Sequence, residues 1–493
     1  MGNPNAQAGA KNIWPKWLSQ YAVWTYVLAL ATVSIIYVSY SIRWYYMLAG
    51  VVSVLVFYTY GHKAAQDTSI VRIKNQKNYE KRIFLIAFVP RVIWMFLIYF
   101  LFLESYGDSF GFENMDAVSY DDLGKVVAKM IKKGNFHFYD ELANYTGNDD
   151  IADMGYGVYV GFIYWLTGNS IIAVRLLKCV LSSWTVLLIY RLTMRNFGAQ
   201  IARIAAIFCA LWPNFWYYCG THLKETEMVF LTVLFVEQAE QMLRSRQFTA
   251  WKVIPILFIV ALLFTFRTVL ALVAVLALLF AIMISSSKVV SWGKRLIIGL
   301  LVLSLMGVTV GNRIAERSQE LVEKVQSGYQ KGNMEWRASR EDTSGHKQDF
   351  AKYASAAVFA PMIFTIPFPS MVNPFEGQEL QELLNGGNFI KNILSFFVIF
   401  SLSVLLLSGR WREHVLPISF LVGYLIVLTV SAFAHSERFH QPVMPFEFMF
   451  MAYGLVITVG SKRYKRWFMG WCVLMFFAAF AWSWFKLAGR GLI

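Results

Sequence analysis

The chain has 493 residues, of which 57% are hydrophobic, 17% aromatic and only 15% charged, with a formal net charge of +15. This composition excludes an ordinary soluble protein and is typical of a chain that crosses a membrane several times. The basic residues lie in short stretches between apolar runs, where an excess of Lys and Arg marks cytoplasmic loops, so the charge gives no support to a nucleic-acid-binding module.

Apolar runs long enough to cross a hydrocarbon core of about 30 Å recur along the chain. They predict thirteen spans, at residues 20–40, 44–60, 83–103, 171–191, 199–217, 225–243, 253–266, 268–286, 295–311, 388–407, 414–432, 442–459 and 467–486. The run 253–286 is too long for one helix, and basic stretches flank it on both sides, so it must cross twice. We therefore expect an all-α polytopic membrane protein with a hairpin that turns near Arg267.

Placing the basic stretches in the cytoplasm puts the N-terminus inside and gathers most other polar residues on the outer face. The predicted organisation is two extra N-terminal spans with a basic cytoplasmic loop (1–82), a transmembrane module (83–311) that includes the first outer loop (104–170), a second outer loop (312–387) and C-terminal spans (388–493). The sequence has no internal repeat of the kind that builds many transporters from two halves.

The first outer loop contains a predicted amphipathic helix that would lie on the outer surface. Ser119 and Asp122 form a pattern like a capping box, apolar residues recur at helical spacing as far as Ile131, and Gly134 follows two lysines. Asp121 and Asp122 are the catalytic candidates; the carboxylate of Asp122 suits the helix N-terminus, and capping alone is the alternative interpretation for it. Asp121 is not needed for the cap, and its functional alternative is a general base at the membrane surface.

Three stretches carry a resemblance to a known family: SYDDLGKVVAKM (119–130), the run from DMGYGVYV to RNFG (153–198), and ARIAAIFCALWPNFWYYCGTHLKETEMVFLTVLF (202–235). They resemble the GT-C glycosyltransferases that use polyprenyl-phosphate sugars, such as the bacterial aminoarabinose transferases and the protein O-mannosyltransferases. In that family a pair of acids opens a surface helix in the first outer loop, and the first acid is the proposed base. The resemblance implies this role for Asp121 and matches Asp122 with the second acid.

Gly155 and Tyr156 stand where the aminoarabinose and O-mannosyl enzymes usually have a Pro-rich turn, so the donor sugar and the acceptor stay open. Transfer from such a donor leaves a polyprenyl phosphate, whose negative charge needs cations beside it at the interface. The candidate cations are Lys224, Arg267 and Arg438. Arg267 lies between two apolar helices, where it is costly unless it has a partner. Lys224 could instead reach outward from the interface, and Arg438 could be a solvated turn residue stabilised by its neighbour Glu437.

The other candidates are substrate contacts on the same outer face: Asp153, His222, Glu225, His435, Glu437 and His440. Family members often have an acid near the places of Asp153 and Glu225, used for acceptor positioning or, in some members, for a metal ion. The histidines lack metal-ligand spacing and the four cysteines are scattered, so no metal site is predicted. No cofactor is expected, with a divalent cation as the alternative left open.

These features predict an integral membrane glycosyltransferase in a bacterial cytoplasmic membrane, with its active site facing the periplasm. Asp121 would take the proton of a hydroxyl on a lipid, protein or glycan acceptor, and the sugar would be transferred with inversion. Two alternatives remain: a flippase or transporter of a lipid-linked glycan, whose charges should lie near the bilayer midplane, and a ligase or polymerase for a diphosphate-linked glycan. The charges crowd one interface instead, and the carboxylate pair in the first loop favours a single-sugar donor.

Overall fold

The computed structural model describes residues 13–66, 76–111, 114–146, 151–245, 249–284, 371–373, 379–430, 437–488 and 492–493. Within these ranges the chain forms helices joined by short turns, without a strand, and two segments meet only in an isolated β-bridge between Ser41 and Val372. The predicted all-α class is confirmed for this part of the chain.

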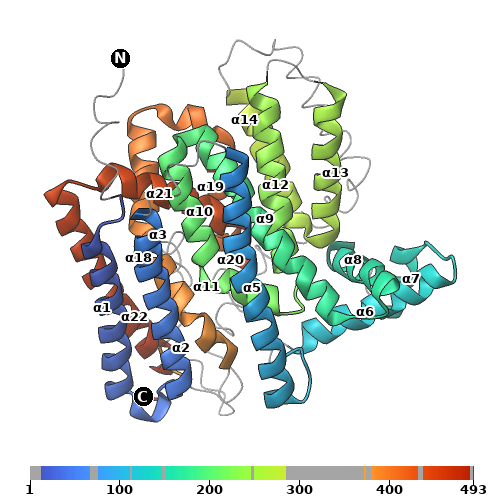
Figure 1. The fold of residues 1–493 in the computed structure, drawn as a ribbon, viewed down its shortest axis with the longest axis horizontal. Helices are drawn as coiled ribbons and strands as arrows, with labels where there is room; N and C mark the ends of the chain where they lie inside the picture. The colour runs from blue at the N-terminus through green and yellow to red at the C-terminus, as the bar shows by residue number, and fades with distance from the viewer. Residues whose placement is uncertain are drawn as a thin grey trace.

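Most helices run roughly parallel to one another and form a single bundle (Figure 1). Its longer helices are α1 (Lys16–Ile36), α2 (Trp44–Leu55), which η3 (Val56–Tyr60) and α3 (Gly61–Gln66) continue, α5 (Gln76–Tyr106), α9 (Ile171–Phe197), α12 (Glu225–Arg244), α18 (Glu379–Leu407) and α22 (Lys462–Ala488). Its shorter helices are α10 (Ala199–Leu211), α11 (Pro213–Gly220), α13 (Ala250–Phe266), α14 (Thr268–Ile284), α19 (Val415–Val430), α20 (Glu437–His440) and α21 (Met444–Thr458).

Seven helices of the described chain are long and apolar enough to cross a membrane, and three more are apolar but shorter. A helix stands at the place of every predicted span except 295–311, which lies outside the described residues, as does most of the second outer loop. The predicted number of thirteen spans therefore stays a prediction. The hairpin predicted at Arg267 is confirmed, because α13 ends at Phe266 and α14 begins at Thr268.

Three helices lie beside one end of the bundle: α6 (Asn114–Lys132), α7 (Phe138–Thr146) and α8 (Ile151–Thr167) (Figure 1). The amphipathic helix predicted in the first outer loop is α6, but its predicted start is wrong. The helix begins at Asn114, and the acid in its first turn is Asp116. No Gly or Pro stands between Asn114 and Ser119 to stop the helix from beginning earlier, so Asp122 lies within the helix and does not cap it.

Glycines let α6 and α8 approach closely. A Cβ added to Gly161 of α8 would lie 2.4 Å from the Cβ of Val127, and one added to Gly157 would lie 2.7 Å from the Cβ of Leu123. On the α6 side, a Cβ on Gly124 would lie 2.4 Å from a methyl carbon of Val160. Interlocked contacts of this kind need residues without a side chain, and they bring polar side chains of the two helices within reach of each other.

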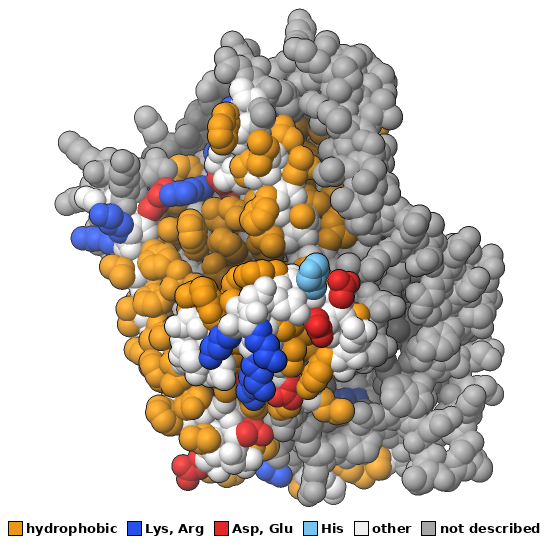
Figure 2. All heavy atoms as spheres, turned by 90° about the vertical axis from the view of Figure 1, so that its right-hand side faces the viewer, with side chains coloured by type: hydrophobic (Ala, Val, Ile, Leu, Met, Phe, Trp, Pro, Cys, Tyr) orange, Lys and Arg blue, Asp and Glu red, His pale blue; other side chains and the backbone are white. Residues whose placement is uncertain are grey.

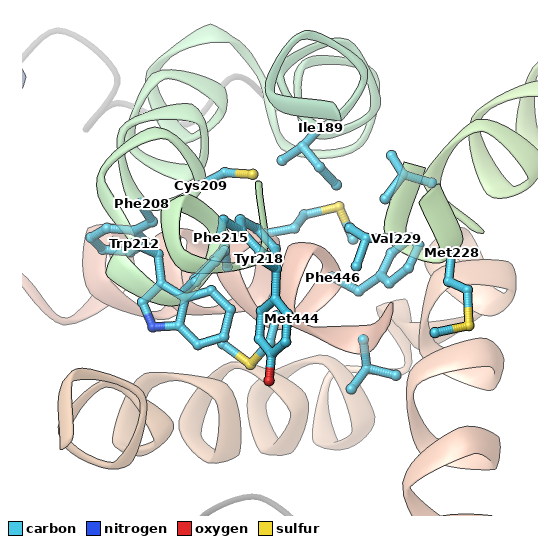
Figure 3. Close-up of a cluster of buried hydrophobic side chains, with 14 of the residues drawn as sticks. Ile189, Phe208, Cys209, Trp212, Phe215, Tyr218, Met228, Val229, Met444 and Phe446 are labelled. Carbon is cyan, nitrogen blue, oxygen red and sulfur yellow. The ribbon is translucent and has the colours of Figure 1, made fainter. Parts of the chain in front are cut away.

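The two extra N-terminal helices pack against the C-terminal ones, so α1 lies beside α22 and α2 beside α18 (Figure 1). Aromatic pairs join α1 to both C-terminal helices: Trp17 packs against Phe468 of α22, and Tyr26 against Phe389 of α18. In the middle of the bundle, Trp212 of α10's C-terminal end and Phe215 of α11 pack against α21, among the buried side chains of Figure 3. The indole N–H of Trp212 donates to the carbonyl of Gly387 at 3.1 Å, which joins this core to α18.

Candidate active site

Asp121 is buried on the side of α6 that faces α8. Its side chain is 3% exposed, its Oδ1 accepts a hydrogen bond from the hydroxyl of Tyr164, and its Oδ2 lies 2.5 Å from Nζ of Lys125. Asp122 points the other way, with 46% of its side chain exposed and Oδ1 3.4 Å from the same Lys125 amine. The hydrogen bond with Asp121 raises the pKa of Lys125 above its ordinary value. The two adjacent acids therefore have different surroundings.

The surface around the exposed side of α6 is basic and partly apolar. Lys129 and Lys132 are exposed on α6, and Phe136 is exposed just beyond it. Figure 2 shows blue side chains gathered on this face among hydrophobic ones, with acidic side chains nearby. Asp121 thus lies beneath a surface with both cationic and apolar character.

Lys224 points into the protein, which excludes the interpretation of an interfacial lysine that reaches outward. It is 2% exposed, and its amine donates to the carbonyl of Phe266 at 3.0 Å, at the end of α13. The amine also lies 5.7 Å from the ring centre of Tyr120, the residue before Asp121. The turn before α12 thereby brings a positive charge next to α6.

Arg438 pairs with two carboxylates, and neither belongs to Glu437, so the predicted pairing with Glu437 is wrong. Nη1 lies 2.5 Å from Oδ2 of Asp116, and Nε donates to the buried carboxylate of Glu225 at the start of α12. The neighbouring Glu437 instead accepts from the Asn214 amide at 2.7 Å and from the Tyr218 hydroxyl at 2.8 Å. Glu437 is buried and accepts these hydrogen bonds, while Arg438 pairs with acids of two other helices.

Arg267 occupies the turn between α13 and α14. Its guanidinium lies 4.2 Å from the ring centre of Phe439, which follows Arg438 in α20. Among the described residues, its buried Nη1 has no hydrogen-bond partner. Lys224 contacts Phe266, the residue before Arg267, and Arg267 contacts Phe439, the residue after Arg438. The structure therefore brings the three predicted cations together near the start of α6.

His222 and His440 have different surroundings. His222 is fully buried between the rings of Phe110, Tyr156 and Tyr164, with centroids 5.8, 6.0 and 6.3 Å away. Burial, followed by the nearby cations of Lys178, Arg175 and Lys125, holds the pKa of His222 well below its ordinary value. Its imidazole is therefore neutral, close to Asp121's partner Tyr164.

His440 lies two residues after Arg438 in α20, but its imidazole contacts other buried side chains. Its Nδ1 is 3.2 Å from Nζ of Lys391 in α18, and the same amine is 3.5 Å from Glu447 in α21. All three side chains are almost fully buried. His435 lies outside the described residues, and Asp153 lies at the start of α8 with its side chain outside them.

Sequence reasoning missed two buried cations on α9. Lys178 donates to the carbonyl of Thr221 at 2.9 Å and to that of Leu223, and its amine is 3.8 Å from Glu227. Arg175 donates to the carbonyl of Ser109 and lies 5.4 Å from the ring centre of Tyr99. Both are fully buried and hold the turns next to His222. The sequence did contain a signal for them: Arg175 and Lys178 lie about one helical turn apart inside an apolar run, where charges are costly without partners.

In the part of the chain that the structure describes, no group of three or more His, Cys, Asp or Glu side chains could hold a metal ion. A comparison with protein families gives one match: residues 157–310 match the model of the family described as dolichyl-phosphate-mannose-protein mannosyltransferase. The matched part of the chain is thus similar to the GT-C glycosyltransferases, the superfamily to which that family belongs. No curated protein and no solved structure gives a significant match.

The match covers part of the candidate site. The matched residues run from α8 through α14 and carry Lys178, Lys224 and Arg267, while the carboxylate pair on α6 precedes the match. The resemblance stated from the sequence is confirmed by this match. Members of the superfamily use polyprenyl-phosphate sugars, so the family implies a lipid-linked donor and a membrane setting.

Proposed function

We propose that the protein transfers one sugar from a polyprenyl-phosphate donor to a hydroxyl of its acceptor, with inversion at the anomeric carbon, and that Asp121 is the general base. The observation that carries this proposal is the arrangement of one buried carboxylate, Asp121, with Lys224, Arg267 and Arg438 at one end of the bundle. A base and a group of cations are the two things that this reaction requires.

In the proposed step, Asp121 takes the proton of the acceptor hydroxyl while the hydroxyl oxygen attacks the anomeric carbon. The bond between that carbon and the phosphate oxygen breaks, and its electron pair leaves with the polyprenyl phosphate. Arg267 is the best-placed cation for this phosphate, because a buried donor of its guanidinium has no protein partner among the described residues. Two carboxylates already balance the charge of Arg438, so its contribution to phosphate binding is smaller.

The donor and acceptor classes follow from the chemistry of the site and from the matching family. The description of that family names a mannosyl donor and a protein acceptor, which makes polyprenyl-phosphate mannose the first donor to try. The acceptor class we propose is wider, a hydroxyl on a lipid, a protein or a glycan. The proposed location is a bacterial cytoplasmic membrane with α6–α8 on the periplasmic face, and divalent-cation dependence can be tested with a chelator.

The deciding experiment incubates the purified protein with a panel of short-chain polyprenyl-phosphate sugars and follows the release of free polyprenyl phosphate. We expect release with at least one donor, and release slower by roughly 10²–10⁴ from the Asp121→Asn variant. Glycan movement across vesicles without release of phosphate would instead indicate a flippase. Release only from diphosphate-linked glycans would indicate a ligase or polymerase.

Labelling of single cysteines tests the orientation. All four native cysteines are buried, so they give little background. Lys132 is exposed at the end of α6, and Lys462 is exposed at the start of α22, at the opposite end of the bundle. An impermeant thiol reagent added to intact cells should label Lys132→Cys and not Lys462→Cys. The reverse pattern would place α6–α8 in the cytoplasm.

A further inference from the structure

The carboxylate of Asp121 has a separate donor on each oxygen, and the two donors differ in mobility. Tyr164 donates to Oδ1, and its side chain is fully buried on α8. Lys125 contacts Oδ2 at 2.5 Å, and 44% of its side chain is exposed. Tyr164 has two side-chain torsions and a packed ring, whereas Lys125 is a flexible chain at the surface. Oδ1 is therefore held, and Oδ2 is the oxygen whose partner can move away.

Packing fixes the position of the Tyr164 hydroxyl. Its ring lies nearly parallel to the imidazole of His222, with an interplanar angle of 15° and centroids 6.3 Å apart. The close approach of α6 and α8 at Gly161 and Gly157 sets the distance between the helix that carries Tyr164 and the one that carries Asp121. Burial, followed by the hydrogen bond to Asp121, raises the pKa of Tyr164, so its hydroxyl keeps its proton and remains a donor.

We propose that Tyr164 is a positioning residue for the base: it holds Oδ1 of Asp121 so that Oδ2 faces the acceptor hydroxyl. This inference rests on the proposed function of Asp121. The acceptor hydroxyl takes the place of the Lys125 amine at Oδ2, its proton moves to Oδ2, and the sugar–phosphate bond breaks as the new glycosidic bond forms. Tyr164 keeps its own proton throughout.

The role predicts a specific change in the pH dependence of transfer. A hydrogen bond to a carboxylate favours its charged form. Without the Tyr164 hydroxyl this hydrogen bond is lost, and we expect the fall of the transfer rate on the acidic side to begin at higher pH. The titratable and charged groups that face this pair are Lys125 and Asp122 on α6, Arg175 on α9 and His222 in the turn before α12. They are the same in the wild type and in a Tyr164 variant.

The test compares Tyr164→Phe with wild type by measuring kcat, KM for the donor, and the pH profile of the rate. We expect kcat to fall about 10- to 100-fold, as for a reacting group that is slightly misplaced. The donor KM should be unchanged, and the acidic limb should move up by roughly one pH unit. Tyr190→Phe is the matched control, because Tyr190 is buried at the far end of α9; its rate and pH profile should equal those of the wild type.

If Tyr164→Phe does not fold, replacement of Tyr164 by 3-fluorotyrosine provides a second variant for the same test. The fluorinated phenol is a stronger hydrogen-bond donor of nearly the same shape, so the acidic limb should move to lower pH. If the folded Tyr164 variants have the pH profile of the wild type while Asp121→Asn has lost transfer, the positioning role is wrong and the proposed function stands. An active Asp121→Asn protein would overturn both.

Discussion

Arg438 contacts Asp116 across 322 positions of the chain, with Nη1 2.5 Å from Oδ2. The same guanidinium donates to Glu225, so one side chain from the C-terminal part joins the surface helix α6 to the start of α12. Asp116 lies in the first turn of the helix that carries Asp121. The ion pair therefore restrains the helix that holds the proposed base.

Removing this arginine should destabilise the protein more than removing its exposed partner. Arg438→Ala leaves Glu225, which is 1% exposed, without its cation, and we expect a loss of about 3–5 kcal/mol in the free energy of unfolding. Asp116→Asn should cost less than about 1 kcal/mol, because the Asp116 side chain is 54% exposed. Thermal unfolding in detergent measures both. The double variant Arg438→Met/Glu225→Gln should recover most of the loss, and a double variant as unstable as Arg438→Ala would contradict this account.

The two adjacent acids should respond differently to the same substitution. Asp121→Asn can still accept the Tyr164 hydrogen bond, so it should fold and bind the donor while transfer falls by roughly 10²–10⁴, the usual contribution of a general base. Asp122→Asn changes a half-exposed side chain and should alter stability by no more than about 0.5 kcal/mol, with activity retained. Single-turnover rates and donor affinity distinguish the variants. A reversed pattern would assign the base to Asp122.

Arg267 should matter for donor binding more than for folding. Arg267→Ala removes a guanidinium with a buried, unpartnered donor and should weaken binding of a polyprenyl-phosphate sugar by roughly 10- to 100-fold, the effect of losing a charge-assisted hydrogen bond. Arg267→Lys should restore only part of it, because an ammonium group cannot bind two phosphate oxygens in a planar fork. A folded Arg267→Ala protein with wild-type donor affinity would give Arg267 a structural role.

The glycines between α6 and α8 provide a test of helix spacing. Gly161→Ala should push α6 away from α8, with a loss of about 1–3 kcal/mol in stability and a marked loss of transfer. Adding Val127→Ala makes room for the new methyl group and should restore part of both. Gly470→Ala is the control, because a Cβ there meets nothing within 4 Å, and it should be neutral or stabilising by up to about 1 kcal/mol. Equal losses of stability and transfer from Gly161→Ala and Gly470→Ala would exclude a spacing effect.

His222 should make the stability depend on pH. Above its ordinary value of 6.5 the imidazole is neutral in both the folded and the unfolded protein. Below that value only the unfolded protein takes up the proton, so stability falls as the pH decreases, by up to about 1.4 kcal/mol per pH unit. Between pH 6.5 and 5 the unfolding temperature should therefore fall more steeply for the wild type than for His222→Phe. Parallel curves would show that His222 is protonated in the folded protein.

The helices were predictable because the thickness of the membrane sets the length of an apolar run, and charge decided the hairpin at Arg267. The capping pattern at Ser119 predicts too late a start for α6, because the helix begins at Asn114 and continues through this pattern. The partners of the site residues were not predictable. Tyr164 reaches Asp121 because α6 and α8 approach each other at glycines. The hydrophobic pattern of each helix predicts which side is buried, but it does not predict which residues of the two helices meet.

The packing of α1 and α2 against α22 and α18 has a consequence for how the protein is made. The first two helices enter the membrane before their partners have been synthesised, since the whole central module lies between them in the chain. Side chains such as Trp17 and Tyr26 must then face lipid or another protein until Phe468 and Phe389 arrive. Closure of the N-terminal helices onto the C-terminal ones therefore requires that α18 and α22 have been synthesised, and a ribosome that stops early would release a chain in which these contacts cannot form.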